Sequence, residues 1–184
     1  MHIEYELKVL DIDVEQVREK LSNLGASYLG KKFFRRYTYD MHPPQPAKWI
    51  RLRTDGSVST LTCKHILDPD AIDGVKEWEF EVWDFVVANQ FLEQIGYKAK
   101  SYQENMRESY VFMNRAVEID SRPLIPSYLE IEGNSEEEVL KVLQFLGLDR
   151  SDHTSQNTIQ IYERYGICGM DQFPYLAFDR VIKK

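Results

Sequence analysis

The chain has 184 residues, 43% of them apolar, a size that suits one compact domain with a sizeable core. Its 23 Lys and Arg against 30 Asp and Glu give a formal charge of −7. This balance argues against a nucleic-acid or anionic-membrane binder, because such partners are held by basic surface. The chain has neither a run of apolar residues long enough to cross a bilayer nor a secretion signal at its start, so we expect a cytoplasmic protein with a small-molecule partner.

Apolar residues at helical spacing, together with capping residues, predict four helices. They span residues 13–25, 84–96, 135–147 and about 155–166. The second carries Val87, Phe91, Leu92 and Ile95 on the face that we expect to be buried. The tail, residues 167–184, has no pattern that assigns it to a helix or a strand.

Alternating segments rich in β-branched and aromatic residues predict eight strands between these helices. They are residues 2–10, 33–40, 48–54, 58–65, 75–83, 100–113, 116–121 and 127–133. Trp49, Trp78 and Trp83 alternate with charged residues, and we predict that they lie in the core rather than form a platform for stacking bases. The prediction is therefore an α+β fold with a mostly antiparallel sheet.

Six of the predicted strands carry ionised side chains on a single face. Neighbouring side chains of a strand point to opposite faces, so Glu4, Glu6 and Lys8 share one face of the first strand. The same parity groups Arg51 with Arg53, Thr62 with Lys64, Glu77 with Glu79 and Glu81, Glu118 with Asp120, and Glu130 with Glu132. An open sheet could turn such faces to water. Their separation into carboxylate rows and cation rows favours a curved sheet with the charges inside.

The two kinds of row predict two kinds of ligand. Clustered carboxylates repel one another unless a divalent cation lies among them, and their oxygens suit Mg²⁺ or Mn²⁺. Clustered Arg and Lys side chains require an anion, and the guanidinium group matches phosphate oxygens. Both rows in one cavity indicate a site for a metal ion and a phosphate group.

The order of these motifs resembles that of a known family. The Glu4-x-Glu6-x-Lys8 strand is followed by Ile50-Arg51-Leu52-Arg53, Leu61-Thr62-Cys63-Lys64, Glu77-Trp78-Glu79-Phe80-Glu81, Arg107, Asp120 and Glu130-Ile131-Glu132. The chain thus resembles the CYTH domains, or triphosphate tunnel metalloenzymes, which include class IV adenylate cyclases, thiamine triphosphatases and inorganic triphosphatases. The resemblance implies a single domain over 1–184, an eight-stranded antiparallel β-barrel tunnel with flanking helices. Its core strands would lie in 2–133, and its C-terminal helices and tail in 134–184.

The resemblance also implies a role for each charged position. Mg²⁺ or Mn²⁺ would be bound by Glu4, Glu6, Asp120, Glu130 and Glu132. The triphosphate would be held by Lys8, Arg51, Arg53, Lys64 and Arg107. Glu4, Glu6 and Lys8 would be the catalytic group, and Glu79 and Glu81 would line the tunnel. The chain departs from the family pattern in three places: Asn105 stands where relatives usually have lysine, Arg36 where many have an acidic residue, and the usual glycine before the Glu-x-Glu strand is missing around Pro126-Ser127.

The activity that this resemblance implies is metal-dependent hydrolysis of inorganic triphosphate or of a small organic triphosphate. Two alternatives stay open. One is an adenylate cyclase, which converts ATP to cyclic AMP and pyrophosphate; the other is a module that binds polyphosphate or nucleotide without turnover. The sequence also leaves open whether two copies associate as a homodimer.

Overall fold

The structure is a computed structural model that describes residues 2–68, 71–148, 153–169 and 172–184, without the side chains of residues 2–4. The helices are α1 (Val14–Asn23), α2 (Phe85–Gln94), α3 (Glu136–Phe145) and α4 (Thr158–Arg164). The longer strands are β1 (His2–Val9), β2 (Ser27–Asp40), β3 (Lys48–Thr54), β4 (Ser59–Ile66), β5 (Val75–Val82), β6 (Ser101–Phe112), β7 (Arg115–Arg122) and β8 (Ile125–Gly133). Three short strands follow: β9 (His153–Thr154), β10 (Tyr175–Leu176) and β11 (Val181–Ile182).

Three of the helices begin where their capping residues predict. The side chains of Asp13, Asp84 and Ser135 each accept a hydrogen bond from a backbone N–H of the first turn. The fourth helix begins later than predicted, because its N-cap is Asn157 rather than Ser155. None of the helices in the described ranges has the length and apolar content that a bilayer crossing requires.

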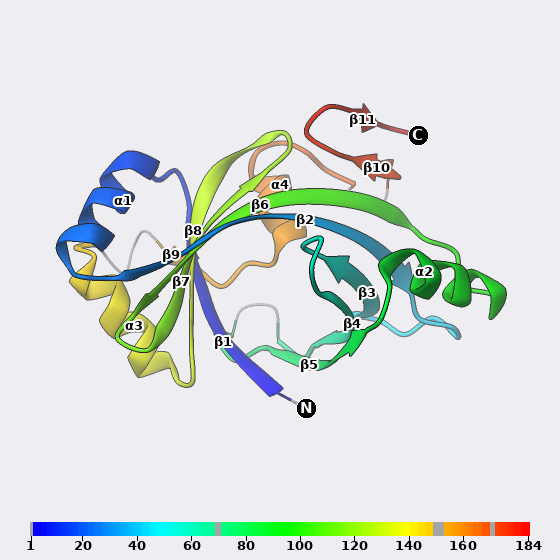
Figure 1. The fold of residues 1–184 in the computed structure, drawn as a ribbon, viewed down its shortest axis with the longest axis horizontal. Helices are drawn as coiled ribbons and strands as arrows, with labels where there is room; N and C mark the ends of the chain where they lie inside the picture. The colour runs from blue at the N-terminus through cyan, green and yellow to red at the C-terminus, as the bar shows by residue number, and fades with distance from the viewer. Residues whose placement is uncertain (1, 69–70, 149–152, 170–171) are drawn as a thin grey trace.

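The longer strands form one strongly curved sheet, as Figure 1 shows. Antiparallel pairing runs in the order β6-β2-β3-β4-β5-β1-β8-β7, and β7 also pairs with β6. The short strands extend this sheet: β9 pairs with β1, β11 pairs with β10, and β10 lies parallel to β6. The α+β class and the mostly antiparallel sheet are as predicted.

The sheet is not the regular closed barrel that the resemblance implied. β1 pairs with β5 only at residues 2–4, and with β8 only at residues 5–9. It therefore crosses diagonally from one half of the sheet to the other, and the strands diverge on either side of it (Figure 1). No residue of β1 is paired with β5 and with β8 at the same time. The junction that β1 forms between the two halves of the sheet is therefore irregular.

The main core lies between α1, α3 and the outer faces of β1, β7 and β8. Leu7, Val117 and Ile131 are fully buried there, and α3 supplies Val139 and Leu143. Each buried strand residue has charged neighbours in the sequence, such as Glu6 and Lys8 beside the first. Because side chains alternate, packing this apolar face on the helices turns the charged face to the concave side.

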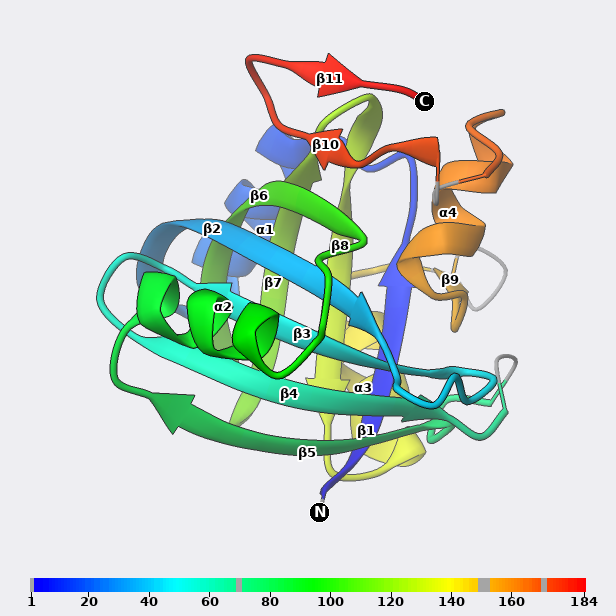
Figure 2. The same cartoon turned by 90° about the vertical axis from the view of Figure 1, so that its right-hand side faces the viewer.

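The helix α2 covers less of the sheet than its sequence predicts. Figure 2 shows it lying across β2 and β3, where Leu92 packs with Tyr39 and other apolar residues. Val87, Phe91 and Ile95, which were expected on the buried face, are exposed. The prediction was wrong because helical spacing gives the width of the apolar face and not how much of it the sheet can cover.

The prediction of three core tryptophans was also wrong. Trp83, between β5 and α2, is fully exposed, and Trp78 on β5 is partly exposed. Trp49 lies at the cavity described below.

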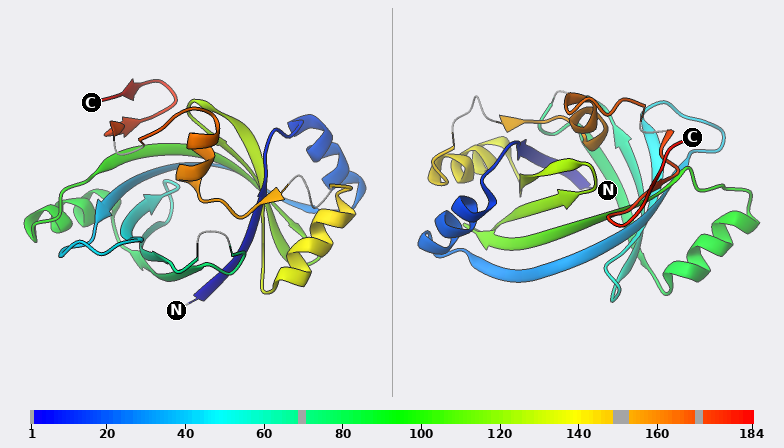
Figure 3. Two further views of the ribbon diagram at one scale, coloured as in Figure 1. Left: turned by 180° about the vertical axis from the view of Figure 1, so that it is seen from behind. Right: turned by 90° about the horizontal axis from the view of Figure 1, so that it is seen from above.

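The fourth helix and part of the tail after it, which the sequence left unassigned, pack onto the body of the molecule. Ile161 and Tyr162 of α4 form a second core with Phe173 and Leu176, against Tyr128 of β8. Figure 3 shows α4 in front of the sheet when the molecule is seen from behind, beside β1 and β8. This packing brings the beginning of α4 to the concave side of the sheet.

Candidate active site

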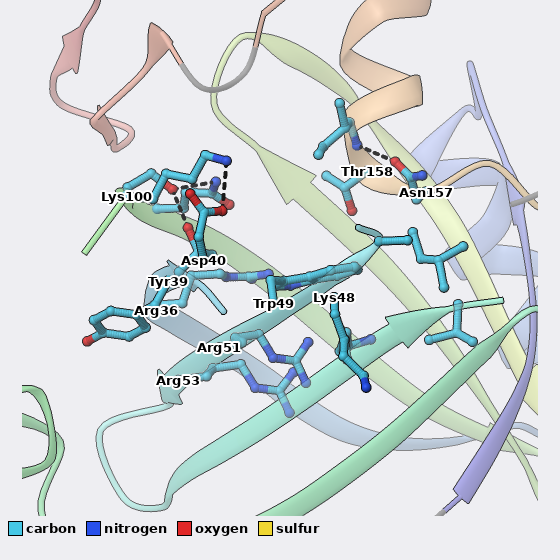
Figure 4. A pocket seen from close by; sticks show the side chains of 18 of the residues that line it. Arg36, Tyr39, Asp40, Lys48, Trp49, Arg51, Arg53, Lys100, Asn157 and Thr158 are labelled. Carbon is cyan, nitrogen blue, oxygen red and sulfur yellow. Dashed lines mark hydrogen bonds and ion pairs between the residues drawn. The ribbon is translucent and has the colours of Figure 1, made fainter. Parts of the chain in front are cut away.

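A cavity of about 630 Å³ lies on the concave side, lined by strands from both halves of the sheet and by the beginning of α4 (Figure 4). Its volume is typical of small-molecule sites. Nine of the described lining residues are Lys or Arg, and four are Asp or Glu. A chain with a net charge of −7 thus has a cavity with an excess of positive charge, which favours an anionic ligand.

A group of acidic residues on β1, β7 and β8, which we call the carboxylate wall, lies at one side of this cavity. It comprises Glu6 and Glu130, which line the cavity, and Glu118, Asp120 and Glu132, which are not part of the lining. The strand register sets carboxylates opposite one another, with Glu6 facing Glu132 and Glu118 facing Glu130. Like charges directly opposite on paired strands repel, so this wall requires cations.

Lys8 supplies one of these cations. Its side chain is almost fully buried, and its Nζ donates to Glu6 Oε1 at 2.7 Å and lies 3.7 Å from Glu130 Oε2. Burial disfavours the charged ammonium, but the two carboxylates outweigh it, so the pKa of Lys8 is raised above its usual value. Lys8 is therefore a fixed positive charge between two strands.

Arg107 of β6 supplies the second cation and contacts three carboxylates. It donates to Asp120 through Nε at 2.9 Å and through Nη2 at 2.8 Å, and to Glu130 Oε1 at 2.7 Å. Its Nη1 forms an ion pair with Glu118. Burial opposes the charge, yet Asp120 and Glu130 raise the pKa of this guanidinium above its usual value.

Asp120 is fully buried and surrounded by donors of the protein itself. Besides Arg107, it accepts from Asn105 Nδ2 at 3.0 Å and from the Tyr128 hydroxyl at 3.3 Å. Arg122 lies 3.6 Å away. Burial acts against the carboxylate, but Arg107 and the other cations lower its pKa below the usual range. The structure thus places Asp120 behind Arg107, as the group that fixes the direction of that guanidinium.

Glu118 belongs to the carboxylate wall, although the site predicted from the sequence does not include it. Burial raises its pKa to about 7; Arg107 opposes this shift, and Glu130 and Asp120 contribute to it. The sequence carried a signal for it, because Glu118 shares the charged face of its strand with Asp120. What the sequence could not show is that the strand register sets Glu118 opposite Glu130.

The opposite side, which we call the cationic wall, is formed by basic residues of β2, β3 and β4. It comprises Arg36, Arg51, Arg53 and Lys64. Figure 4 shows Arg51 and Arg53 projecting side by side from β3. Burial, Arg51 and Arg107 lower the pKa of Arg53 to about 10, with Glu79 and Glu118 acting against the shift. Repulsion among these cations makes the wall a site for an anion.

The strand β5 provides carboxylates that neutralise part of the cationic wall. Glu77 forms an ion pair with Lys64 and lies 3.7 Å from Arg51 Nη2. Glu79 lies 3.3 Å from Arg51 Nη2 and accepts a hydrogen bond from the Thr62 hydroxyl at 2.5 Å. Among the described residues, the cavity lining includes neither Glu79 nor Glu81, and Glu81 is exposed.

Most of the side chains predicted for the site come together at the cavity. The predicted residues that line it are Glu6, Lys8, Arg51, Arg53, Lys64, Arg107 and Glu130. Asp120 lies behind this lining, and Glu132 faces Glu6 across β1 and β8. The side chain of Glu4 lies outside the described residues. The structure adds Arg36, Lys48, Lys100 and Arg122, of which Lys100 forms an ion pair with Asp40 at 2.9 Å.

Two of the described carboxylates in this wall are close enough to contact the same cation. Glu6 and Glu130 come from neighbouring strands and lie within 4 Å of the same nitrogen, that of Lys8, so a single cation can contact both. Among the described side chains, no three acidic, histidine or cysteine residues are grouped to hold an ion. Mg²⁺ is commonly bound by one or two carboxylates together with substrate phosphates and water, so these two residues fit that pattern.

Comparison with known proteins finds relatives at the level of structure. No protein-family model matches the chain, and no curated protein matches it. Among solved structures, it is similar to the PH1012 protein from Pyrococcus horikoshii OT3. The two are 27% identical with a TM-score of 0.72, over 86% of this chain and 98% of that one.

Two further solved structures share the fold at lower identity. A proposed adenylate cyclase from Vibrio parahaemolyticus is 14% identical with a TM-score of 0.73, over 88% of this chain and 98% of that one. The other is HpAC1 from Hippeastrum, a proposed adenylyl cyclase described as having a dominant triphosphatase activity. It is 17% identical with a TM-score of 0.61, over 94% of this chain and 99% of that one. These likenesses confirm the resemblance in the sequence. The chain has the fold of the CYTH domains, or triphosphate tunnel metalloenzymes.

Proposed function

We propose that this protein is a divalent-metal-dependent phosphohydrolase that acts on inorganic triphosphate or a small organic triphosphate bound in the cavity. The observation that carries the proposal is the pairing of the two walls across one cavity. The cationic wall matches the charge of a polyphosphate, and the carboxylate wall offers oxygen ligands for Mg²⁺ or Mn²⁺. The triphosphatase activity described for HpAC1, which has the same fold, agrees with hydrolysis.

The proposed roles follow from where each side chain lies. Arg51, Arg53 and Lys64 bind and orient the phosphate chain, because they project into the cavity from adjacent strands. Glu6 and Glu130 hold the metal ion, and Glu4 and Glu132 on the same strands are proposed to assist them. When bound, the metal ion neutralises phosphate charge and polarises the bond that is broken.

Two buried cations are proposed to connect the carboxylate wall to the substrate. Lys8 lies at the cavity next to Glu6 and supplies a donor to a phosphate oxygen. Arg107, which shares the Glu130 carboxylate with Lys8, contacts the substrate from the same wall, and Asp120 is proposed to hold it in place rather than to bind metal. This assignment rests on the donors that already surround the Asp120 carboxylate.

Product analysis tests the proposal directly. The purified protein is given tripolyphosphate, thiamine triphosphate or ATP, each with Mg²⁺, Mn²⁺ or a chelator. We expect metal-dependent release of phosphate, lowered at least about a hundredfold in Glu6→Gln. Glu19→Gln, an exposed change on α1 with the same loss of charge, serves as the matched control and should match the wild type.

Two other results would replace the proposal. Formation of cyclic AMP and pyrophosphate from ATP would identify an adenylate cyclase. Tight binding of tripolyphosphate without turnover under any of these conditions would identify a binding module, and Glu6→Gln should then bind the anion as well as the wild type or better.

A further inference from the structure

Arg36 on β2 is a buried cation without a carboxylate partner. Only 7% of the residue is exposed, and it lines the cavity. Among the described residues, no Asp or Glu forms an ion pair with it, and its Nε has no hydrogen-bond partner. Burying an unpaired charge is costly, so a folded protein keeps such a group only where something else compensates for it.

The surroundings of Arg36 add positive charge rather than remove it. Its strand partner on β3 is Arg53, and Arg122, also 7% exposed, lies at the same part of the cavity. Burial and then repulsion from Arg122, Arg51 and Arg53 lower the pKa of Arg36 well below its usual value, with Asp120 acting against the shift. The unliganded protein thus holds several guanidinium groups against their mutual repulsion.

A neutral side chain fixes the direction of Arg36. Its Nη2 donates to Oδ1 of Asn105, a residue of β6 that is almost fully buried. The Nδ2 of Asn105 in turn donates to Asp120, which also accepts from Arg107. The guanidinium groups of Arg36 and Arg107 are therefore linked through one buried network. An amide orients Arg36 but does not neutralise it.

Arg122 is held by a different set of contacts, which keeps it close to Arg36. Its Nε donates to the Tyr128 hydroxyl at 2.8 Å, and its Nη2 lies 3.6 Å from Asp120. The only carboxylate among these contacts is Asp120, which already accepts two hydrogen bonds from Arg107. Arg107 is also paired with Glu118 and Glu130, whereas Arg122 has only Asp120 and Arg36 has no ion-pair partner among the described residues. The protein therefore leaves positive charge around Arg36 and Arg122 that is not fully balanced.

We propose that Arg36 is a substrate-binding residue that holds one phosphoryl group of the polyphosphate, at the end of the cationic wall next to Arg122. The proposal rests on the function proposed above and extends its anion site from β3 and β4 to β2. The phosphate oxygens supply the negative charge that the protein does not provide around Arg36, and the planar guanidinium suits them. The same phosphoryl group would bridge Arg36 and its positive neighbour Arg122.

The test compares Arg36→Gln with Arg35→Gln. Both changes remove one positive charge from β2, but Arg35 is exposed on the opposite face of the strand, over the Phe85 ring. Two quantities are measured on each purified protein: the dissociation constant for tripolyphosphate by calorimetry without metal, and the midpoint of thermal unfolding without ligand.

We expect Arg36→Gln to weaken tripolyphosphate binding by about ten- to a hundredfold, the usual loss for a hydrogen bond to a charged group. The midpoint of unfolding should stay the same or rise, because an unpaired buried charge has been removed. Arg35→Gln should change the dissociation constant by less than about twofold. Arg36→Lys, which keeps the charge without the planar fork, should bind with intermediate affinity.

A dissociation constant of Arg36→Gln within about twofold of the wild type would overturn the proposal. A midpoint lowered by several degrees would overturn it as well, because it would show that Arg36 stabilises the fold. These results are distinct from a failure of the proposed function. A wild-type protein that binds tripolyphosphate without hydrolysing it refutes the hydrolase, while the assignment of Arg36 is still decided by binding.

Discussion

The carboxylate wall and the cationic wall are both built from alternating strands, yet their charges are balanced in different ways. The carboxylate wall is neutralised from within, by Lys8 and Arg107, whose side chains are 3% and 15% exposed. The cationic wall is neutralised by Glu77 and Glu79 on β5, and the second of these is 35% exposed. Arg36 has no carboxylate partner among the described residues.

This difference indicates what each wall contributes. Charges that are paired inside the protein stabilise the fold, and removing one partner leaves the other buried and unpaired. Charges that repel one another in the free protein, such as those of Arg36 and Arg53, are stabilised further when a ligand of opposite sign is bound. Removing Arg107, the cation that three carboxylates share, should therefore cost more stability than removing a cation of the cationic wall, whose loss should act mainly on ligand binding.

The largest effect is expected for Arg107→Ala. This change leaves Glu118, Asp120 and Glu130 without their shared cation, and breaking such a buried network costs about 3–5 kcal/mol. The free energy of unfolding, measured with urea at neutral pH, should fall by that amount. A loss below about 1 kcal/mol would show that the carboxylate wall does not depend on its internal cation.

Two further variants sharpen this prediction. Arg115→Ala also removes an arginine of the same sheet, but its partner Glu138 is 36% exposed, so the loss should be much smaller. The double variant Arg107→Ala/Asp120→Asn should recover part of the stability, because it removes one of the buried charges that the single variant leaves unpaired.

A smaller effect on stability and a larger one on binding are expected for Arg53→Gln. The nearest carboxylate oxygen of an ion-pair partner, on Glu79, is 4.0 Å away, so little is lost in the free protein. The dissociation constant for tripolyphosphate should rise about tenfold, while the free energy of unfolding changes by less than about 0.5 kcal/mol. A loss of stability comparable to that of Arg107→Ala would remove the distinction between the two walls.

Arg53 also gives the cationic wall a dependence on pH. Because its pKa is lowered to about 10, the side chain is charged at neutral pH and loses its proton as the pH rises through that value. Tripolyphosphate binding by the wild type should weaken over this range. The Arg53→Gln variant, which lacks the titrating group, should show a shallower dependence when the two titrations are measured side by side.

Local signals in the sequence account for much of what was predicted. The caps at Asp13, Asp84 and Ser135 define helix starts through contacts within one turn, and the structure confirms them. Alternation also places Lys8 and Arg51 on charged faces, and both line the cavity. These features depend on neighbours a few residues away, so a single sequence contains them.

Features that depend on strand register could not be read in the same way. Periodicity places Glu118 and Glu77 on charged faces, but only the pairing of strands sets the first opposite Glu130 and the second opposite Lys64. The same limit applies to Arg36, because its lack of a carboxylate partner depends on what β3 and β6 bring beside it. The first part of β2 was missed for a related reason: its ladder to β6 is broken by a bulge next to Gly30.

The smallest effect is expected at the turn that joins the two strands carrying most of the cationic wall. Asp55 accepts hydrogen bonds from the backbone N–H groups of Ser57 and Val58, and from Lys32 Nζ at 2.5 Å. Burial opposes its charge, but these donors prevail and lower its pKa to about 2. A carboxyl group with a lowered pKa stabilises the folded state above its ordinary pKa of 3.8, and this stabilisation is lost as the pH falls toward 2.

Asp55→Ala should therefore lower the free energy of unfolding by about 1 kcal/mol at neutral pH, and the difference from the wild type should shrink as the pH falls from about 4 to about 2. Urea unfolding at several pH values measures it. Asp55→Asn keeps an acceptor for the turn and loses only the charge. Its free energy of unfolding should therefore lie between those of the wild type and Asp55→Ala. A difference that stays constant down to about pH 2 would show that the ionised carboxylate contributes nothing, and that the turn alone holds β3 and β4 in register.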